Sequence, residues 1–229
     1  MTILLIATRN AHKAGEIRAI LGARFQLLTL NGFAAAPKVI EDAETFAGNA
    51  TKKAVALARW LAAGSSKLKL KTSRPDFVLA DDSGLEVDAL NGAPGVLSAR
   101  FAAPGNRENS HDADNNARLL HLLKDVPLEK RAARFRCVIA LVPVPRGKVG
   151  SSSPVCFADE LEAQIFDGAC AGRIQLSASG LGGFGYDPLF VPDGFSQSFA
   201  ELGEDVKDQL SHRARALAKL RAFLNERRD

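Results

Sequence analysis

The chain has 229 residues, of which 46% are hydrophobic and 24% charged, as in an ordinary globular protein with a substantial core. No apolar run approaches the roughly 20 residues needed to span a bilayer, so we expect no membrane association. The formal net charge of +4 suits an anionic ligand but falls short of the basic surface typical of nucleic-acid-binding proteins, so we expect no nucleic-acid partner.

The cysteines and the apolar start indicate the compartment. Cys137, Cys156 and Cys170 are an odd number without a close pair, so they favour neither a disulfide framework nor a zinc site. Residues 2–7 run directly into a polar loop, which is typical of a strand and not of a signal peptide. We expect a cytoplasmic protein in which residues 1–229 form a single domain.

The first half of the chain predicts two strands and two helices. Residues 3–7 read as a strand, and apolar residues recur at helical spacing from about Ala11, with Asn10 as the N-cap. A second helix is expected at about residues 45–63, with Lys53 inside its apolar stripe. A short strand is expected at residues 77–80.

The second half adds further helices and strands. A helix is expected near residues 112–124, and residues 134–144 and 155–165 read as strands of a hairpin. A glycine-rich loop covers residues 180–192, and a last helix covers about residues 209–225. Strands mixed with helices predict an α/β (mixed α+β) protein, and no repeat is present.

Two acidic segments are candidate metal ligands. Asp81-Asp82-Ser83-Gly84 follows a predicted strand, and adjacent carboxylates there repel unless a cation or solvent intervenes, which favours Mg²⁺. The alternative is a solvated turn whose Asp side chains bond backbone amides. Glu41 lies just before a helix, where the alternative is compensation of the helix dipole.

Two lysines are candidate anion ligands. Lys53 needs an anion if its ammonium is buried, and the alternative is that its stem follows the core edge while the ammonium reaches solvent. Lys13 opens a helix whose free backbone amides attract anions, and Thr8, Arg9 and Asn10 could donate hydrogen bonds from the same loop. This combination predicts a phosphate-binding loop.

The glycine-rich run at residues 180–187 contains a formal GxGxxG match. Tyr186-Asp187-Pro188 follows where a dinucleotide-binding unit requires a helix, so we reject that interpretation. The run is instead a loop that can approach a flat ligand, with Phe184 or Tyr186 available for stacking, or else a plain glycine-rich turn. Ser211-His212-Arg213 begins the last helix, and Arg213 is suited to a phosphate or a base edge.

These motifs occur together in one order along nearly the whole chain, and the combined series is highly specific. The series is Ala7-Thr8-Arg9-Asn10 with Lys13 and Glu16; Phe46, Asn49-Ala50 and Lys53-Ala54; Asp81-Asp82-Ser83-Gly84-Leu85; Gly92-Ala93-Pro94-Gly95 with Ser98-Ala99-Arg100; Gly182-Gly183-Phe184-Gly185-Tyr186-Asp187-Pro188; and Ser211-His212-Arg213. It resembles the inosine triphosphate pyrophosphatase family, whose bacterial members are dITP/XTP pyrophosphatases.

The resemblance implies an elongated two-lobed fold with a central mixed sheet flanked by helices, a nucleotide cleft between the lobes, and a homodimer. It implies that Glu41 and Asp82 serve Mg²⁺, and that Asp82 is also the proton acceptor. The substrate-binding residues that it implies are Thr8, Arg9, Asn10, Ala11, His12, Lys13 and Lys53 for the triphosphate, Ser83 beside Asp82, and Phe184, Gly185, Tyr186, Asp187, Lys207, His212 and Arg213 for the base and sugar.

Three positions depart from the family pattern. Arg9 stands where the family usually has Gly, and Gly48 stands where many members have Glu, which leaves one carboxylate fewer near the metal. The polar insertion at residues 65–75 also looks longer than usual. None of these departures removes a residue that the chemistry requires.

The resulting hypothesis is Mg²⁺-dependent hydrolysis of non-standard purine nucleoside triphosphates to the monophosphate and pyrophosphate, by attack of water on the α-phosphorus. An alternative is a non-catalytic nucleotide- or RNA-binding module, which predicts strong salt dependence and tolerance of Asp82→Asn. A second alternative is a pyrophosphatase for modified pyrimidine nucleotides. The Phe184–Asp187 and Ser211–Arg213 motifs favour the purine-type enzyme.

Overall fold

The computed structural model describes residues 1–64, 74–106, 108–145 and 161–226. Most of the predicted insertion at 65–75, the predicted hairpin connection and residues 155–160 lie outside this part of the chain. The chain divides into two compact units, of which the first contains Met1–Asp82 and Val138–Phe166. The second contains Ser83–Cys137 and Asp167–Asp229. That residues 1–229 form a single two-lobed domain stays a prediction.

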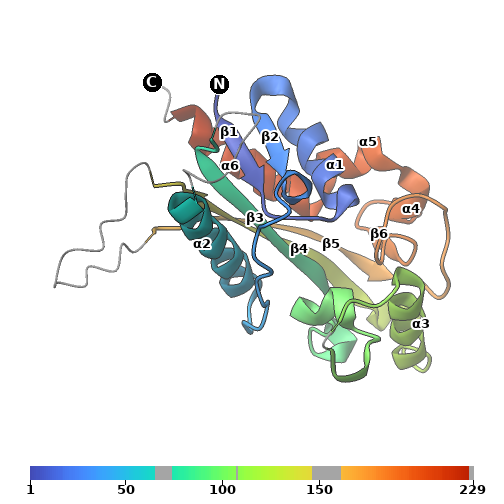
Figure 1. The fold of residues 1–229 in the computed structure, drawn as a ribbon. Coiled ribbons are helices and arrows are strands. Elements are labelled where there is room, and N and C mark those ends of the chain that lie inside the picture. The colour runs from blue at the N-terminus through green and yellow to red at the C-terminus, as the bar shows by residue number, and fades with distance from the viewer. Residues whose placement is uncertain (65–73, 107, 146–160, 227–229) are drawn as a thin grey trace. The chain divides into compact units, whose positions relative to one another are not determined.

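A six-stranded mixed sheet has the strand order β2-β1-β3-β4-β5-β6 (Figure 1). Its strands are β1 (Ile3–Ile6), β2 (Gln26–Thr29), β3 (Phe77–Val87), β4 (Ala132–Pro143), β5 (Gln164–Ile174) and β6 (Phe190–Pro192). Strand β1 is parallel to β2 and β3, whereas β5 and β6 are antiparallel. The predicted mixed α/β fold, with helices flanking a central mixed sheet, is confirmed.

The first unit carries helices α1 (Ala11–Leu21) and α2 (Phe46–Gly64). Asn10 caps α1 as predicted, because its Oδ1 accepts a hydrogen bond from the amide of Lys13 at 3.1 Å. Thr45 caps α2 in the same way through the amide of Gly48 at 3.0 Å. The predicted apolar stripe of α2 is buried, and it places Lys53 against β3.

Strand β3 is longer than the sequence predicts. The acidic residues Asp81 and Asp82 lie inside the strand, so the predicted end of the strand at residue 80 is wrong, and the alternative of a solvated turn at these residues is excluded. Carboxylates are tolerated in a buried strand only when cations compensate them. Lys13 and Lys53 supply that compensation here.

The second unit has its own apolar core, formed by residues from β3, β4, β5, the segment 186–190 and the helices around them. Its helices are α3 (Asp112–Leu122), α4 (Phe199–Leu202), α5 (Glu204–Leu210) and α6 (His212–Glu226). Short 3₁₀ segments in the two units are Gly22–Arg24, Leu30–Gly32, Asp88–Leu90, Gly95–Arg100, Pro104–Asn106 and Leu128–Lys130.

The last helix, α6, begins at His212 and not at about residue 209 as the sequence predicts. The extended backbone of Ser211 separates α5 from α6. Oγ of Ser211 accepts a hydrogen bond from the amide of Ala214 at 3.1 Å. Ser211 is therefore an N-cap, and His212 and Arg213 are the first residues of α6.

The position of β5 corrects a second prediction. Described residues 161–163 are not in a strand, and β5 begins at Gln164, where the strand predicted for residues 155–165 was to end. Strand propensity disfavours the glycines of β5, but close packing requires them. A Cβ on Gly168 would lie 2.1 Å from the His212 carbonyl, and one on Gly172 would lie 2.3 Å from the Val191 carbonyl. The predicted loop at residues 180–192 likewise ends in β6.

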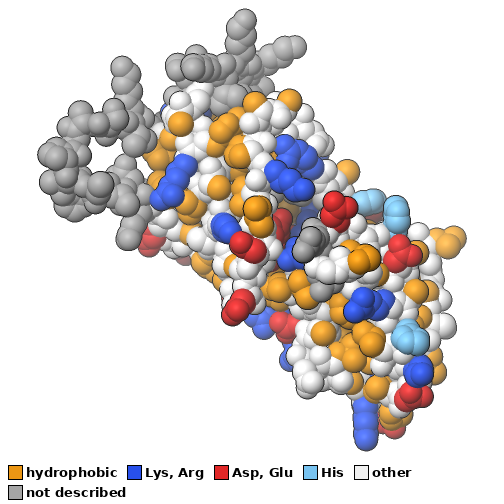
Figure 2. Space-filling model, turned by 60° about the horizontal axis from the view of Figure 1, so that its bottom comes forward, with side chains coloured by type: hydrophobic (Ala, Val, Ile, Leu, Met, Phe, Trp, Pro, Cys, Tyr) orange, Lys and Arg blue, Asp and Glu red, His pale blue; other side chains and the backbone are white. Residues whose placement is uncertain are grey.

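The surface carries charges of both signs. On the face drawn in Figure 2, Lys and Arg side chains are interspersed with Asp and Glu side chains. This distribution agrees with the modest net charge and differs from the continuous basic stripe of many nucleic-acid-binding proteins. None of the described helices is long and apolar enough to cross a membrane.

Candidate functional site

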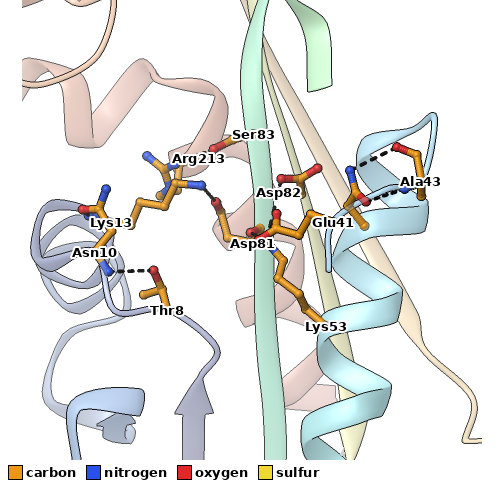
Figure 3. Close-up of polar contacts among 11 residues, drawn as sticks. Thr8, Asn10, Lys13, Glu41, Ala43, Lys53, Asp81, Asp82, Ser83 and Arg213 are labelled. Atoms are coloured by element: carbon orange, nitrogen blue, oxygen red, sulfur yellow. Dashed lines mark hydrogen bonds and ion pairs between the residues drawn. The ribbon is translucent and has the colours of Figure 1, made fainter. Parts of the chain in front are cut away.

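Asp81 and Asp82 are consecutive residues of β3, so their side chains leave opposite faces of the strand. The Asp81 carboxylate is buried, and its Oδ1 lies 2.5 Å from Nζ of Lys13 (Figure 3). Lys13 comes from the first turn of α1. The predicted phosphate-binding lysine therefore rests on a buried carboxylate in this structure.

Lys53 is held by acceptors from two segments of the first unit. Its Nζ lies 2.8 Å from Oε2 of Glu41, 2.7 Å from the Asp81 carbonyl and 3.7 Å from Oδ1 of Asp82 (Figure 3). The residue is only 9% exposed. Burial with these partners excludes the alternative in which the ammonium escapes to solvent, and it also gives Glu41 a role beyond the helix dipole.

Glu41, Asp81 and Asp82 form an acidic cluster around Lys13 and Lys53, and Asp82 is the carboxylate whose charge these lysines compensate least. It is 7% exposed, and its buried Oδ2 has no hydrogen-bond partner among the residues that the structure describes. Burial raises the pKa of Asp82 to about 6, while the charges of Lys53 and Lys13 oppose the rise and those of Glu41 and Asp81 add to it. A group in this state can accept a proton or a cation near neutral pH.

Glu41 and Asp82 fit a magnesium site in which phosphate oxygens of the substrate supply further ligands. Mg²⁺ in nucleotide sites is usually held by one or two carboxylates together with phosphate oxygens. Among the described residues there is no group of three or more His, Cys, Asp or Glu side chains that could hold a metal ion by itself. Oδ1 of Asp82 lies 3.7 Å from Nζ of Lys53, and Oδ2 has no hydrogen-bond partner among the described residues.

The raised pKa of Asp82 predicts a stability effect in metal-free protein. The folded pKa of about 6 lies above the usual 3.8, so the stabilisation from protonation is complete below pH 3.8 and is lost as the pH rises through 6. We expect Asp82→Asn to be more stable than the wild type at pH 7.5 in EDTA, with the difference about 1 kcal/mol smaller at pH 5. Chemical unfolding at both pH values checks this. A constant difference would contradict it, and Asp42→Asn, at an exposed carboxylate, is the control.

The loop before α1 holds the other predicted phosphate ligands. Oγ1 of Thr8 accepts a hydrogen bond from the Asn10 amide at 3.1 Å, and Arg9 donates to the Ala36 carbonyl at 3.3 Å. Ala11 and His12 are exposed in the first turn of α1. The loop therefore leads into the start of a helix, where the positive end of the helix dipole attracts anions.

The predicted nucleoside ligands gather in the second unit. Nζ of Lys207 lies 2.5 Å from Oδ2 of Asp187, and both side chains are buried. The same oxygen accepts a hydrogen bond from the Phe184 amide at 2.8 Å. Nζ of Lys207 also lies 4.4 Å from the centre of the Phe184 ring, within the range of a cation–π contact. Asp187 and Lys207 thus fix the position of Phe184.

Tyr186 does not have the role that a stacking residue requires. Its ring is buried, and its hydroxyl donates a hydrogen bond to the Ser98 carbonyl at 2.9 Å. Of the two aromatic residues proposed for stacking, the half-buried Phe184 is therefore the one that can meet a flat ligand. Tyr186 braces the loop against the 3₁₀ segment Gly95–Arg100.

His212 and Arg213 lie at the start of α6. Arg213 is buried and donates to Oγ of Ser83 at 2.9 Å (Figure 3), and its guanidinium carbon lies 5.9 Å from the centre of the Phe184 ring. The His212 ring stacks on Phe135 at 4.8 Å. The structure thus brings Ser83, Phe184 and Arg213 together within one unit, although they are far apart in sequence.

Gly183 offers a test of the buried Asp187–Lys207 pair, because it lies against the Asp187 side chain. Its φ is +73°, and an added Cβ would lie 2.3 Å from Oδ2 of Asp187. We expect Gly183→Ala to lower the unfolding free energy by about 2 kcal/mol more than Gly194→Ala does, because the buried Asp187–Lys207 pair must move. Gly194 has a similar φ of +85°, and none of the described residues lies within 4 Å of its added Cβ, so Gly194→Ala measures the backbone cost alone. Equal losses in urea unfolding would rule out the steric contribution.

Comparisons with known proteins agree over nearly the whole chain. The Ham1 family model matches residues 4–223. A dITP/XTP pyrophosphatase from Geobacter sulfurreducens is 46% identical over 225 residues, covering 98% of this chain and 97% of that protein. One from Opitutus terrae is 43% identical over 224 residues, covering 95% and 96%. A HAM1 protein structure from Coxiella burnetii has a TM-score of 0.75 at 31% identity, covering 99% and 100%. The resemblance found in the motifs is confirmed, and the chain belongs to the Ham1 family.

Proposed function

We propose that the protein is a nucleoside triphosphate pyrophosphohydrolase that acts on non-standard purine nucleotides, namely dITP, ITP, XTP and dXTP. Its products would be the monophosphate and pyrophosphate. The observation that carries the proposal is the buried carboxylate of Asp82, which lies close to Lys53. Its Oδ2 has no hydrogen-bond partner in the part of the chain that the structure describes, and its pKa is raised to about 6. The relatives described above are dITP/XTP pyrophosphatases, which supports the proposed substrate class.

The first unit would bind the triphosphate. Lys13 and Lys53 would contribute positive charge to its oxygens, and Thr8, Arg9, Asn10, Ala11 and His12 would contribute donors around the start of α1. Glu41 and Asp82 would hold Mg²⁺, which neutralises charge on the phosphate oxygens when bound. Asp82 would orient the attacking water and accept its proton through Oδ2, since that oxygen has no other partner among the described residues.

The second unit would bind the nucleoside. Phe184 would stack on the base, and Ser83 and Arg213, which are hydrogen-bonded to each other, would contact the substrate. Gly185, Tyr186, Asp187, Lys207 and His212 would shape the pocket for base and sugar. Selection of a 6-keto purine follows if the pocket donates a hydrogen bond to O6, because adenine would leave that buried donor facing an amino group.

The remaining properties that we propose follow from the family and from composition. The protein would act as a cytoplasmic homodimer on a small-molecule substrate, without nucleic acid or membrane as partner. The mixture of positive and negative side chains on the face drawn in Figure 2 supports the absence of a nucleic-acid partner.

A substrate panel tests this function. Purified protein is incubated with dITP, XTP, dATP and dGTP, each with Mg²⁺ and with EDTA, and the products are separated by ion-exchange chromatography. We expect monophosphate and pyrophosphate from dITP and XTP, with no turnover in EDTA. Equal turnover of dATP would refute the substrate class. Full activity in EDTA would refute the metal requirement, and binding without turnover would favour a binding module.

A further inference from the structure

The backbone of Gly185 is held from both sides by helix α3. Its N–H donates a hydrogen bond to Oδ2 of Asp112 at 2.7 Å, and its C=O accepts one from Nδ2 of Asn116 at 3.0 Å. Asp112 and Asn116 are four residues apart, so they share one face of the helix. The two side chains thus form a clamp on one peptide segment, the Gly185 clamp.

The clamp acts on a residue whose conformation needs support. Gly185 has a φ of +63°, in the left-handed region, and it directly follows Phe184. Glycine has more conformational freedom than any other residue, so the direction of the chain here depends on outside contacts. Asp187 holds the Phe184 backbone through its N–H. Because the N–H and the C=O of the next residue, Gly185, are also bound, the backbone on both sides of the Phe184 side chain is held in place, and this sets the orientation of the ring.

Helix α3 is itself firmly anchored within the second unit. Leu119 is fully buried in the core. The buried Asn115 accepts from the Ala102 amide at 2.8 Å and donates to the Ala99 carbonyl at 3.4 Å. Because α3 is fixed within the second unit, the Gly185 clamp holds the loop in a defined position.

We propose that Asp112 and Asn116 are positioning residues, which hold Phe184 ready to stack on the base and thereby set the affinity for the nucleoside part of the substrate. This inference rests on the proposed function, because it takes Phe184 as the base-stacking residue. Asp112 and Asn116 belong to the second unit and bond the backbone of Gly185, whereas Asp82 and Lys53 belong to the first, so the chemical step should be little affected.

Asp112→Ala and Asn116→Ala test the clamp. Each is expected to raise KM for dITP and Kd for dIMP by roughly fivefold, with kcat changed less than about twofold, because one hydrogen bond to the loop is lost and fewer molecules hold the binding conformation. Asp112→Asn keeps an acceptor oxygen and should remain within about twofold of the wild type.

Asp114→Ala is the matched control. Asp114 lies in the same first turn of α3 and is exposed, so its loss removes the same charge from the helix dipole without removing a contact to Gly185. KM and Kd should stay at the wild-type values in this variant. Equal effects of Asp112→Ala and Asp114→Ala would overturn the proposal, since the dipole would then explain both.

Amide hydrogen exchange of Gly185 supplies a readout that does not need turnover. Exchange should be faster in Asp112→Ala than in Asp114→Ala or the wild type, because the N–H loses its acceptor. Unchanged exchange with an unchanged Kd for dIMP would overturn the proposal. If the wild type did not hydrolyse dITP, the proposed function would fail, and the exchange and dIMP binding would still decide on the clamp.

Discussion

Asp82→Asn is expected to lower kcat for dITP by about 10²–10⁴-fold, the range typical for loss of a general base. The substitution removes the charge and basicity of Oδ2 while keeping the size of the side chain. The melting temperature should stay the same or rise, because the buried charge is removed and Lys53 keeps Glu41 and the Asp81 carbonyl as partners. Steady-state kinetics and thermal unfolding of the same preparation measure both effects.

Asp42→Asn is the control for Asp82→Asn. Asp42 neighbours Glu41 in sequence but is exposed and paired with Lys52, so the same chemical change should leave kcat within about twofold of the wild type. An Asp82→Asn protein with more than about a tenth of wild-type kcat would show that this carboxylate is not the proton acceptor.

Lys53→Met is the second substitution with a large expected effect. It would lower the unfolding free energy by about 3 kcal/mol, because the buried carboxylate of Asp82 loses its compensating charge. Solvent limits the contribution from Glu41, whose side chain is 35% exposed. For a chain of this length the loss corresponds to roughly 6–12 °C in melting temperature. Turnover should fall at least about 10²-fold, since a cation near the phosphates is lost.

Lys52→Met provides the comparison on the same helix. The side chains of Lys52 and Asp42 are 46% and 62% exposed, so their ion pair should contribute less than about 1 kcal/mol. Differential scanning calorimetry of Lys53→Met and Lys52→Met compares the stability contribution of the buried ion pairs with that of the exposed ion pair. Equal melting temperatures would mean that Lys53 does not hold the acidic cluster together.

The helical half of the site could be predicted from sequence because helices have a regular period. Lys53 falls on the apolar stripe of α2, which makes a buried ammonium that needs an anion one of two interpretations. Asn10 as a cap of α1 follows from its residue type and position. Such rules work where the conformation depends on residues within one helical turn of each other.

The strands and long-range contacts could not be predicted in the same way. Asp81 and Asp82 look like a turn because isolated carboxylates avoid strands, and the sequence does not show that the distant Lys13 and Lys53 compensate their charges within the longer β3. Gly168 likewise disfavours a strand until α6 packs against it. The Gly185 clamp joins residues 73 and 69 positions apart, and no local pattern signals it.

Hydrolysis of dITP in water enriched in ¹⁸O tests the central claim most directly, because it identifies the phosphorus that water attacks. We expect dIMP and pyrophosphate as the products, with the label in dIMP only, as attack on the α-phosphorus requires. Label in pyrophosphate, or the products dIDP and orthophosphate, would contradict the proposed reaction.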